Sequence, residues 1–294
     1  MKKGTDYFIS LLLVLVSLVW GGSFIIVKIA TIEIDPVHLG FLRFLIATPI
    51  MILVLLFLKR DTYIPLKELP SLAVLGLTGV TLLYTFQFIG ISYTNAPAAS
   101  VLINTNVIFI AILSALFLKE KFNVKKILGV LLSFSGVLIV IFSNIRQEAF
   151  SFSNVFFIGS ILVLLSAFCW AIYSIVGKRL LRIYDTFAVT TYAFTLGSIF
   201  YIPFVILDIV PLLQKISFNG WISILYLAIL CSVFGYVGWY YSLKKSEASK
   251  AAVYLNLIPL FTITISIFMG KIPTIFFLFG AILIIYGVYL TQKS

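Results

Sequence analysis

Long apolar stretches occupy almost the whole of this chain, and they constrain its fold more than any other feature. A helix needs ~20 mostly apolar residues to cross a bilayer. We expect spans at residues 8–28, 36–58, 69–91, 95–118, 126–143, 155–177, 186–208, 219–243, 248–269 and 275–292. The connections between them are too short for a soluble catalytic domain. The sequence therefore predicts an all-α integral membrane protein of ten transmembrane helices, the first of them uncleaved.

The composition agrees with a membrane protein and excludes several other classes. Hydrophobic residues make up 62% of the chain and charged residues 11%, against ~25% charged residues in an ordinary soluble domain. The net charge of +11 is explained by cations at the cytoplasmic ends of helices, so we expect no nucleic-acid partner. Cys169 and Cys231 lie in separate apolar runs. We predict no metal site and no cofactor.

The distribution of positive residues predicts the orientation in the membrane. If the N-terminus is cytoplasmic, sixteen of the 21 Lys and Arg residues fall on the cytoplasmic side and four on the outside, with Arg43 inside a span. Positive residues favour the cytoplasmic side of a membrane. We therefore expect a multi-pass protein of the plasma (inner) membrane with both termini in the cytoplasm.

The two halves of the chain resemble each other. The segment from Trp20 to Lys28 aligns with the segment from Trp170 to Lys178 at an offset of 150 residues. Further pairs follow in order at offsets of 150 to 152: Asp35 and Asp185, Phe44 and Phe194, Tyr84 and Tyr236, Asn104 and Asn256, Phe109 and Phe261, Gly129 and Gly280, Gly136 and Gly287. We therefore divide the chain into repeats at 1–146 and 147–294. Five helices per repeat would insert the second repeat upside down, as in many transporters.

These motifs resemble the drug/metabolite transporter superfamily, and within it the EamA-like ten-helix family. The residues that carry the resemblance are Trp20 to Phe24 with Lys28, Phe41 to Phe44, Asn95 to Ser100, Glu120, Gly129, Gly136 with Val137, Trp170, Glu247 to Ala252, Pro259, Gly280, and Gly287 with Val288. The resemblance implies transport of small metabolites through a central cavity between the halves. The chain departs from the family pattern twice: Lys271 follows the ninth helix where an acid is usual, and Val107 stands opposite Pro259.

Polar residues near the middle of the spans are the candidate substrate-binding residues. Asn104 and Asn256 should face the protein interior, because an amide in lipid would lack a hydrogen-bond partner. They either bind substrate or join helices. Trp20 and Trp170 either stack on a substrate or only pack within the protein interior. The remaining aromatic and amide candidates for an amphipathic cavity are Tyr84, Gln87, Tyr173, Tyr236 and Trp239.

Four charged or titratable residues allow a structural and a functional interpretation each. Arg43 is the deepest charge; it pairs with Glu33 or Asp35, or it binds a substrate carboxylate. Lys28 and Lys178 are interfacial anchors or charged gates at opposite ends. His38, the single histidine, is an interfacial residue or a proton-coupling group. No carboxylate lies at mid-depth, which favours facilitative transport over proton coupling.

The sequence thus predicts a secondary, facilitative transporter that exports small metabolites such as amino acids by alternating access. A flippase for a lipid or a lipid-linked sugar is the alternative. A membrane-embedded enzyme is disfavoured, because no nucleophile with a base, no paired acids and no metal set occurs. The expected partners are a small-molecule solute and membrane lipids, and the protein is a monomer or a homodimer. The sequence does not identify the solute.

Overall fold

The protein is helical throughout the residues that the structure describes, which are 2–59, 63–94, 96–145, 154–207, 209–269 and 275–294 of a computed structural model. No strand occurs in these ranges. The uninterrupted helices of at least 18 residues are α1 (Lys2–Ala30), α2 (Pro36–Phe57), α5 (Ala96–Leu118), α6 (Val124–Ile145), α7 (Asn154–Leu180), α8 (Thr186–Val205) and α14 (Ile275–Gln292). A short helix, α9 (Ile209–Leu213), follows α8.

Three further rods are composite, because a turn of different pitch interrupts each of them. The first begins with η1 (Leu66–Glu68) and joins α3 (Leu69–Gly76), the π-helical η2 (Leu77–Thr81) and α4 (Leu82–Tyr93). The second joins α10 (Phe218–Leu225), the π-helical η3 (Tyr226–Phe234) and α11 (Gly235–Lys245). The third joins α12 (Ala248–Val253), the 3₁₀-helical η4 (Tyr254–Asn256) and α13 (Leu257–Phe268).

The interruptions have local causes in the sequence. In the π-helical turns a side-chain hydroxyl donates to the carbonyl five residues earlier: Thr81 to Gly76 at 3.4 Å and Ser232 to Leu227 at 3.0 Å. Pro259 has no backbone N–H, and its ring clashes with the carbonyl four residues back, which explains why the third rod is broken directly before it. The matching helix α5 has Val107 in that place and is unbroken.

Seven helical segments of the described residues are long and apolar enough to cross a membrane. They are Tyr7–Ala30, Pro36–Phe57, Leu66–Tyr93, Asn154–Leu180, Thr186–Val205, Phe218–Lys245 and Ala248–Phe268. Two apolar helical stretches, Leu102–Leu118 and Leu278–Gln292, are shorter. Many large apolar side chains on the outside of the bundle are exposed. The chain is a multi-pass membrane protein, whereas the full set of ten spans stays a prediction.

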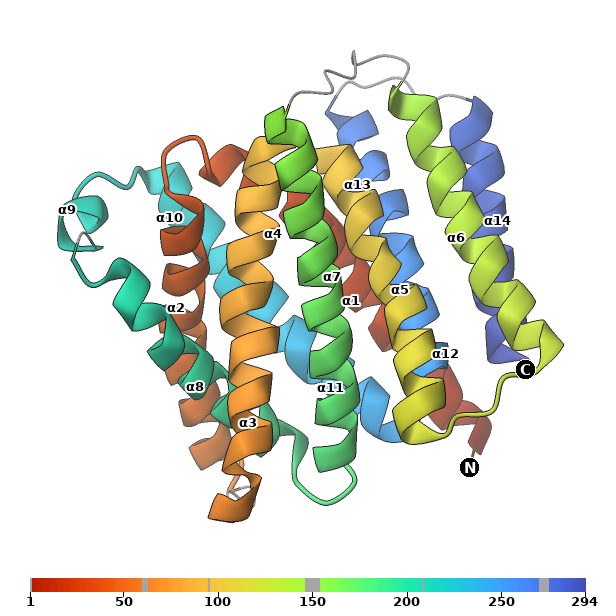
Figure 1. Ribbon diagram of the computed structural model, residues 1–294, viewed down its shortest axis with the longest axis horizontal. Helices are drawn as coiled ribbons and strands as arrows, with labels where there is room; N and C mark the ends of the chain where they lie inside the picture. Colours follow the sequence, from red (N-terminus) through yellow and green to blue (C-terminus); the bar gives the residue numbers. More distant parts are fainter. Residues whose placement is uncertain (1, 60–62, 95, 146–153, 208, 270–274) are drawn as a thin grey trace.

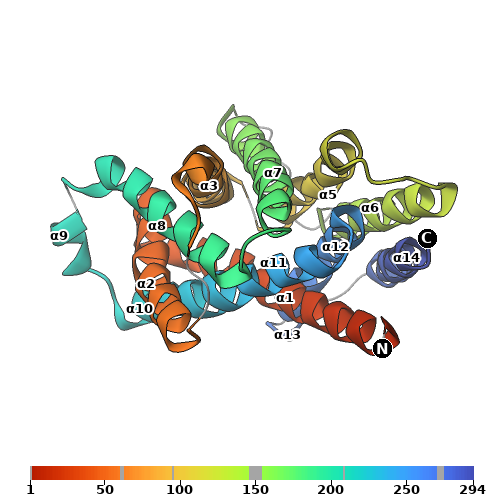
Figure 2. The same cartoon turned by 90° about the horizontal axis from the view of Figure 1, so that it is seen from below.

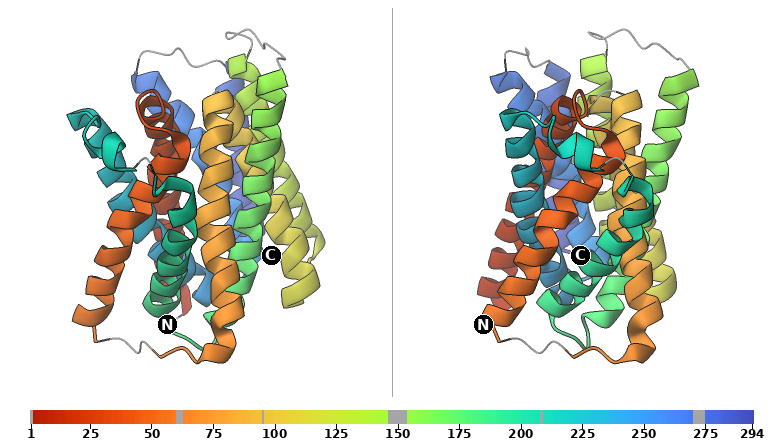
Figure 3. Two further views of the ribbon diagram at one scale, coloured as in Figure 1. Left: turned by 60° about the vertical axis from the view of Figure 1, so that its left-hand side comes forward. Right: turned by 90° about the vertical axis from the view of Figure 1, so that its left-hand side faces the viewer.

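The helices run side by side along one direction and form a single bundle (Figures 1 and 3). Seen along that direction, α1, α11 and α12 cross the middle, and α6 and α14 form a pair at one edge (Figure 2). Glycines allow that pair to approach closely: a Cβ added at Gly136 would lie 2.7 Å from the Gly280 carbonyl oxygen, and one at Gly129 would lie 2.7 Å from that of Gly287.

Both chain termini lie at the same end of the bundle, which we call the termini end (Figure 1). The connections from α5 to α6, from α7 to α8 and from α11 to α12 also lie there, and the connections from α1 to α2 and from α4 to α5 lie at the opposite end. Two helices begin with aspartate caps, Asp35 for α2 and Asp185 for α8, and each accepts a hydrogen bond from a backbone N–H of its helix.

Candidate functional site

A small pocket lies in the centre of the bundle and joins residues from both halves of the chain. Its volume is about 50 Å³, well below the ~300–1,000 Å³ of typical ligand sites. Its lining residues are Trp20, Ser23, Phe24, Arg43, Leu83, Tyr84, Gln87, Ile103, Asn106, Trp170, Leu255 and Ile258. They come from α1, α2, α4, α5, α7 and the third composite rod (η4 and α13), so these six rods must pack correctly to form the pocket.

An aromatic cluster fills the bundle on the termini side of this pocket. Trp20 and Trp170 meet edge to face with ring centroids 5.1 Å apart. Trp170 stacks on Tyr173 at 5.3 Å and contacts Tyr236 at 5.4 Å and Trp239 at 5.6 Å. The rings of Tyr173, Tyr236 and Trp239 are fully buried. Such pairs contribute ~0.5–1.5 kcal/mol each beyond area burial, so the cluster is a stable plug in this conformation.

Hydrogen bonds hold most polar atoms of the aromatic cluster. The Trp20 indole donates to the Cys231 carbonyl at 3.0 Å, and the Trp239 indole donates to the Ser174 hydroxyl at 3.2 Å. The Tyr236 hydroxyl bonds to the Gly79 carbonyl oxygen at 2.5 Å, and it lies 3.0 Å from the Tyr84 hydroxyl. These bonds connect the π-helical turns η2 and η3 to the middle of the bundle.

Arg43 is the one charged side chain among the lining residues of the central pocket. It is 2% exposed. Its Nε donates to the Ser232 hydroxyl at 2.5 Å, and its guanidinium carbon lies 4.0 Å from the centroid of the Tyr84 ring. Its Nη2 is buried without a hydrogen-bond partner among the described residues. The guanidinium therefore has aromatic and hydroxyl neighbours but no counter-ion in this part of the chain.

The expected pairing of Arg43 with Glu33 or Asp35 is wrong. Glu33 accepts a hydrogen bond from the Ser217 hydroxyl at 2.9 Å, at the opposite end of the bundle. Asp35 caps α2 and lies 3.1 Å from Nδ1 of His38. Glu33 and Asp35 lie directly after α1 and bond to groups at helix ends. Arg43 lies two helical turns into α2, and its side chain points toward Ser232 in η3.

The two predicted asparagines are fully buried but do not line the central pocket. Asn104 Nδ2 donates to the Ser100 carbonyl in its own helix at 2.5 Å. Asn256 Nδ2 donates to the Ser133 hydroxyl of α6 at 2.7 Å, which joins two helices. Sequence reasoning passed over Asn106 instead, which lines the pocket and has a buried Oδ1 without a partner. Helical periodicity explains this, because residues two positions apart point in different directions.

The structure divides the ten sequence candidates into two groups. Five line the pocket: Trp20, Arg43, Tyr84, Gln87 and Trp170. Five lie outside its lining: Asn104, Tyr173, Tyr236, Trp239 and Asn256. Three of the second group belong to the aromatic cluster. Sequence reasoning named neither Ser23 nor Asn106 as a candidate, and Ser23 is the repeat counterpart of Tyr173.

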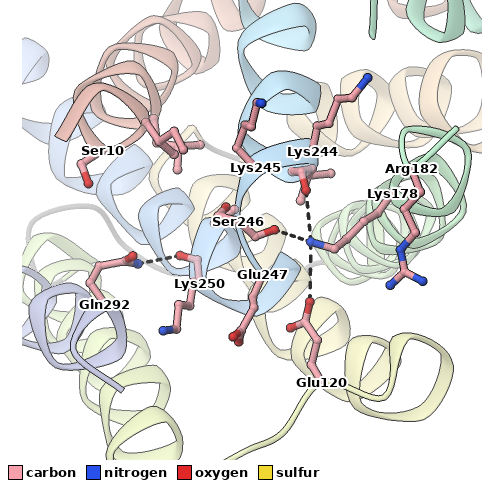
Figure 4. A pocket seen from close by; sticks show the side chains of 14 residues that line it. Ser10, Glu120, Lys178, Arg182, Lys244, Lys245, Ser246, Glu247, Lys250 and Gln292 are labelled. Atoms are coloured by element: carbon pink, nitrogen blue, oxygen red, sulfur yellow. Dashed lines mark hydrogen bonds and ion pairs between the residues drawn. The ribbon is translucent and has the colours of Figure 1, made fainter. Parts of the chain in front are cut away.

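A second and larger cavity of about 640 Å³ opens at the termini end (Figure 4). Basic residues predominate around it. Its charged lining residues are Lys178, Arg182, Lys244, Lys245 and Lys250 against Glu120 and Glu247. Lys178 Nζ donates to the backbone carbonyls of Leu243, at 3.1 Å, and Ser246. We call this cavity the basic vestibule.

Glu120 lines the basic vestibule and binds the N-terminus of α12. Its carboxylate accepts hydrogen bonds from the backbone N–H groups of Ala248 and Ser249, at 2.6 and 3.1 Å, and from the Ser249 hydroxyl at 2.5 Å. Lys126 and Lys178 each have Nζ 3.8 Å from it. An acid at a helix N-terminus satisfies orphan N–H groups and complements the helix dipole.

The charge state of Glu120 follows from these contacts. Burial acts to raise the pKa of the carboxyl. The hydrogen bonds from Ser249 and Ala248 and the positive charge of Lys178 outweigh burial and lower the pKa below its ordinary value. The acid is therefore ionised at neutral pH. We call Glu120, Lys126, Lys178, Glu247 and Ser249 the latch; Lys126 also binds Glu247 directly.

Lys28 forms a related arrangement at the opposite end. Its Nζ donates to the carbonyls of Ile91, Ser92 and Thr94 at 3.2, 3.2 and 2.9 Å. Ile91 and Thr94 lie 152 residues before Leu243 and Ser246, so each lysine binds the same places at the end of its neighbouring rod. Among the described residues, no carboxylate pairs with Lys28. Lys271, which stands in the position matching Glu120, lies outside the described residues.

The comparison with known proteins agrees with this architecture. The model of the EamA-like transporter family matches residues 8–142 and, a second time, residues 157–292. The chain belongs to the EamA-like transporter family. It is 43% identical to an uncharacterized transporter of Archaeoglobus fulgidus over 97% of both chains. It is 34% identical to another from the same organism, over 94% of this chain and 95% of that one.

More distant EamA relatives carry the same kind of name, and a solved structure has the same fold. An uncharacterized transporter of Bacillus subtilis, YyaM, is 29% identical over 92% of this chain and 89% of its own length. A solved structure titled only "Crystal structure of protein" matches with a TM-score of 0.80 and 17% identity, covering 98% of this chain and 97% of that one. The EamA family and these names identify a membrane transporter, and such a protein implies a small-molecule substrate.

Proposed function

We propose that this EamA protein is a secondary, facilitative transporter that exports small metabolites such as amino acids by alternating access. The observation that carries the proposal is the central pocket, which is lined by both halves of the chain and shut off from the termini end by the aromatic cluster and the latch. A path closed on one side of a central site is what alternating access requires of one of its states. The pocket must widen to admit a solute.

An inverted repeat would supply the two states. The double match of the family model and the paired lysines, Lys28 and Lys178, support two five-helix repeats at 1–146 and 147–294 within a ten-span fold. The π-helical turns also fall at matching positions, because η2 shifted by 152 residues covers 229–233, which lies within η3. Two halves of similar packing can exchange conformations at little cost in free energy, which would open the site first to one side and then to the other.

The charges support a proposed orientation and a proposed mode of coupling. The termini end carries the basic vestibule, and positive residues favour the cytoplasm, so we place both termini on the cytoplasmic side of the plasma membrane. In the part of the chain that the structure describes, no Asp or Glu lines the central pocket. A proton-coupled carrier generally needs such a titratable group within the membrane. Transport driven by the solute gradient alone fits this site better.

Counterflow in proteoliposomes tests the proposal. Purified protein is reconstituted with unlabelled solute inside, and uptake of radiolabelled amino acids and nucleosides is followed with and without a pH gradient. Saturable exchange of one solute class, with a rate that the pH gradient does not change, is the expected result. A rate that follows the imposed pH gradient would contradict facilitative transport. Absence of exchange for every soluble solute would contradict the transport of small metabolites.

A further inference from the structure

The central pocket holds a buried positive charge that the described protein leaves incompletely paired. Arg43 lines the pocket and is 2% exposed, and its Nη2 has no hydrogen-bond partner among the described residues. Its Nε is bound to Ser232, which fixes the side chain. The Tyr84 ring lies beneath the guanidinium, and a cation–π contact offsets only ~0.5–2 kcal/mol. An unpaired charge in a low-dielectric site costs more than that, so the site favours an anionic ligand.

The same pocket holds an unpaired acceptor. The Asn106 side chain is 3% exposed, lines the pocket, and has an Oδ1 without a hydrogen-bond partner. A buried acceptor without a donor costs ~1–3 kcal/mol. A ligand that donates one hydrogen bond would remove this cost. The buried lining atoms without a partner are thus one donor with a positive charge and one acceptor, which complement a ligand with an anionic group and an N–H or O–H group.

The remaining walls of the pocket are mainly apolar. Trp20, Trp170 and Phe24 line it together with Leu83, Ile103 and Ile258. Apolar and aromatic walls favour a ligand with an apolar group, while a few polar groups set its orientation. One guanidinium and no second cation line the pocket, so a monoanionic carboxylate matches the charge better than a phosphate dianion.

The basic vestibule supplies an independent argument for an anion. Five basic residues against two acids surround a cavity of about 640 Å³ at the termini end. Clefts lined by charges of one sign raise the local concentration of ions of the opposite sign. An exported solute would pass this vestibule before it reaches the pocket, so both places on its path are positive.

We infer that the pocket binds a carboxylate-bearing solute, with the carboxylate on Arg43, a hydrogen-bond donor of the solute on Asn106 and its apolar group against Trp20 and Trp170. Bidentate contact with a carboxylate is the geometry that a guanidinium favours. The inference rests on the proposed transport function and deepens it, because it excludes neutral nucleosides and cations as the main substrates of this site.

Equilibrium binding tests the inference separately from transport. The purified protein in nanodiscs is titrated with matched pairs of probes, each a carboxylate and its primary amide: L-alanine, L-leucine, L-phenylalanine and L-tryptophan with their amides. We expect at least one carboxylate to bind about tenfold or more tightly than its amide. Equal affinity within every pair, or no binding of any of the four carboxylates, would overturn the inference. Competition by inorganic phosphate as strong as by the carboxylate would also overturn it.

Substitutions assign the discrimination to Arg43. Arg43→Gln should reduce the ratio between carboxylate and amide to within about twofold, and Arg43→Lys should retain part of it, because the positive charge remains. Lys215→Gln removes an exposed charge that does not line the pocket and is the matched control with an unchanged ratio. A ratio that survives in Arg43→Gln would overturn the inference. If Arg43→Gln does not fold, the ratio in Arg43→Lys decides, since a ratio equal to that of the wild type contradicts a bidentate contact.

Transport assays separate the two proposals. Carboxylate binding without exchange in proteoliposomes would leave the inference standing and contradict the transporter proposal. Exchange of a neutral nucleoside such as uridine, without preference for carboxylates, would support transport and overturn the inference. Asn106→Leu provides a further readout: it should weaken binding of L-leucine by about tenfold and leave binding of 4-methylpentanoate, which lacks the amine, within about threefold.

Discussion

Each end of the bundle has a lysine at the matching position of its repeat, but only at the termini end do carboxylate contacts among the described residues reinforce that lysine. Lys178 and Lys28 each bind carbonyl oxygens at the end of a neighbouring rod. At the termini end, Glu120 adds bonds to α12 and ion pairs with two lysines, whereas at the opposite end no carboxylate of the described residues joins Lys28. A repeated framework with one added acid therefore gives two ends of unequal strength.

The two sides of the central pocket also differ, and again the termini side is the more tightly closed. Tyr173 and Trp239 fill the termini side of the pocket, and the residues at the matching positions of the first half are Ser23 and Gln87. These smaller side chains are half-buried and line the pocket. The pocket thus exists where the repeat has small residues, and the plug exists where it has rings. Side-chain differences between matching positions of the two repeats therefore decide which side of the pocket is closed.

The largest expected effect comes from making the interior alike on both sides. Trp239→Gln installs the residue of the opposite side, removes a fully buried indole and should lower the free energy of unfolding by about 3–5 kcal/mol. Thermal unfolding in detergent measures the loss. Access of a thiol reagent to Cys169, tested in vesicles from the termini side, should increase. Trp239→Phe is the control and should keep the plug closed.

The reverse substitution, at the matching position of the first repeat, tests the same difference between the two sides of the pocket. Gln87→Trp places a ring in the pocket, so we expect overpacking to cost about 1–3 kcal/mol and solute binding to be lost. Binding and thermal unfolding are measured on the same sample. Retained binding with unchanged affinity would contradict the placement of the solute site in this pocket.

Removal of the acid tests the difference between the two ends. Glu120→Gln leaves the shape but weakens the charged hydrogen bonds to Ala248 and Ser249, and should cost about 2–3 kcal/mol of stability. Thermal unfolding of the variant and of Glu68→Gln, a control acid outside the latch, measures it. A cost as small as that of the control would mean that the latch does not stabilise this conformation.

The two lysines allow a direct comparison of the ends. Lys178→Met should lower stability by about 1 kcal/mol more than Lys28→Met, because it also leaves Glu120 with one ion pair fewer. The difference between the two melting temperatures is the measurement. Equal costs would show that the carbonyl bonds alone matter and that the acid adds nothing to the lysine.

The smallest effect is a pH dependence of the latch. The pKa of Glu120 is lowered in the folded protein from an unfolded value of 4.5, so the unfolded state takes up a proton first as the pH falls. The stabilisation is fully present above pH 4.5 and disappears as the pH falls through the folded pKa. The difference in melting temperature between the wild type and Glu120→Gln should therefore shrink below pH 4.5. A constant difference would contradict the role of the ionised acid.

Much of the fold was predictable from the sequence, because membrane helices follow from local composition. The expected stretches at 36–58 and 219–243 differ from α2 and from the second composite rod by at most two residues at either end. The site was less predictable: Trp20, Arg43 and Tyr84 line the pocket, but the choice of Asn104 over Asn106 needed the rotation of α5, which its nearly uniform apolarity conceals.

The sequence by itself determined that the chain crosses a membrane several times and belongs among transporters, because apolar runs, charge distribution and repeated motifs act over short distances along the chain. Only the tertiary structure decided which side chains meet. It turned Arg43 toward Ser232 and away from Glu33, and it brought Glu120 onto the start of α12, 128 residues away. Such contacts depend on how helices rotate and pack against one another, and that packing involves every neighbour at once.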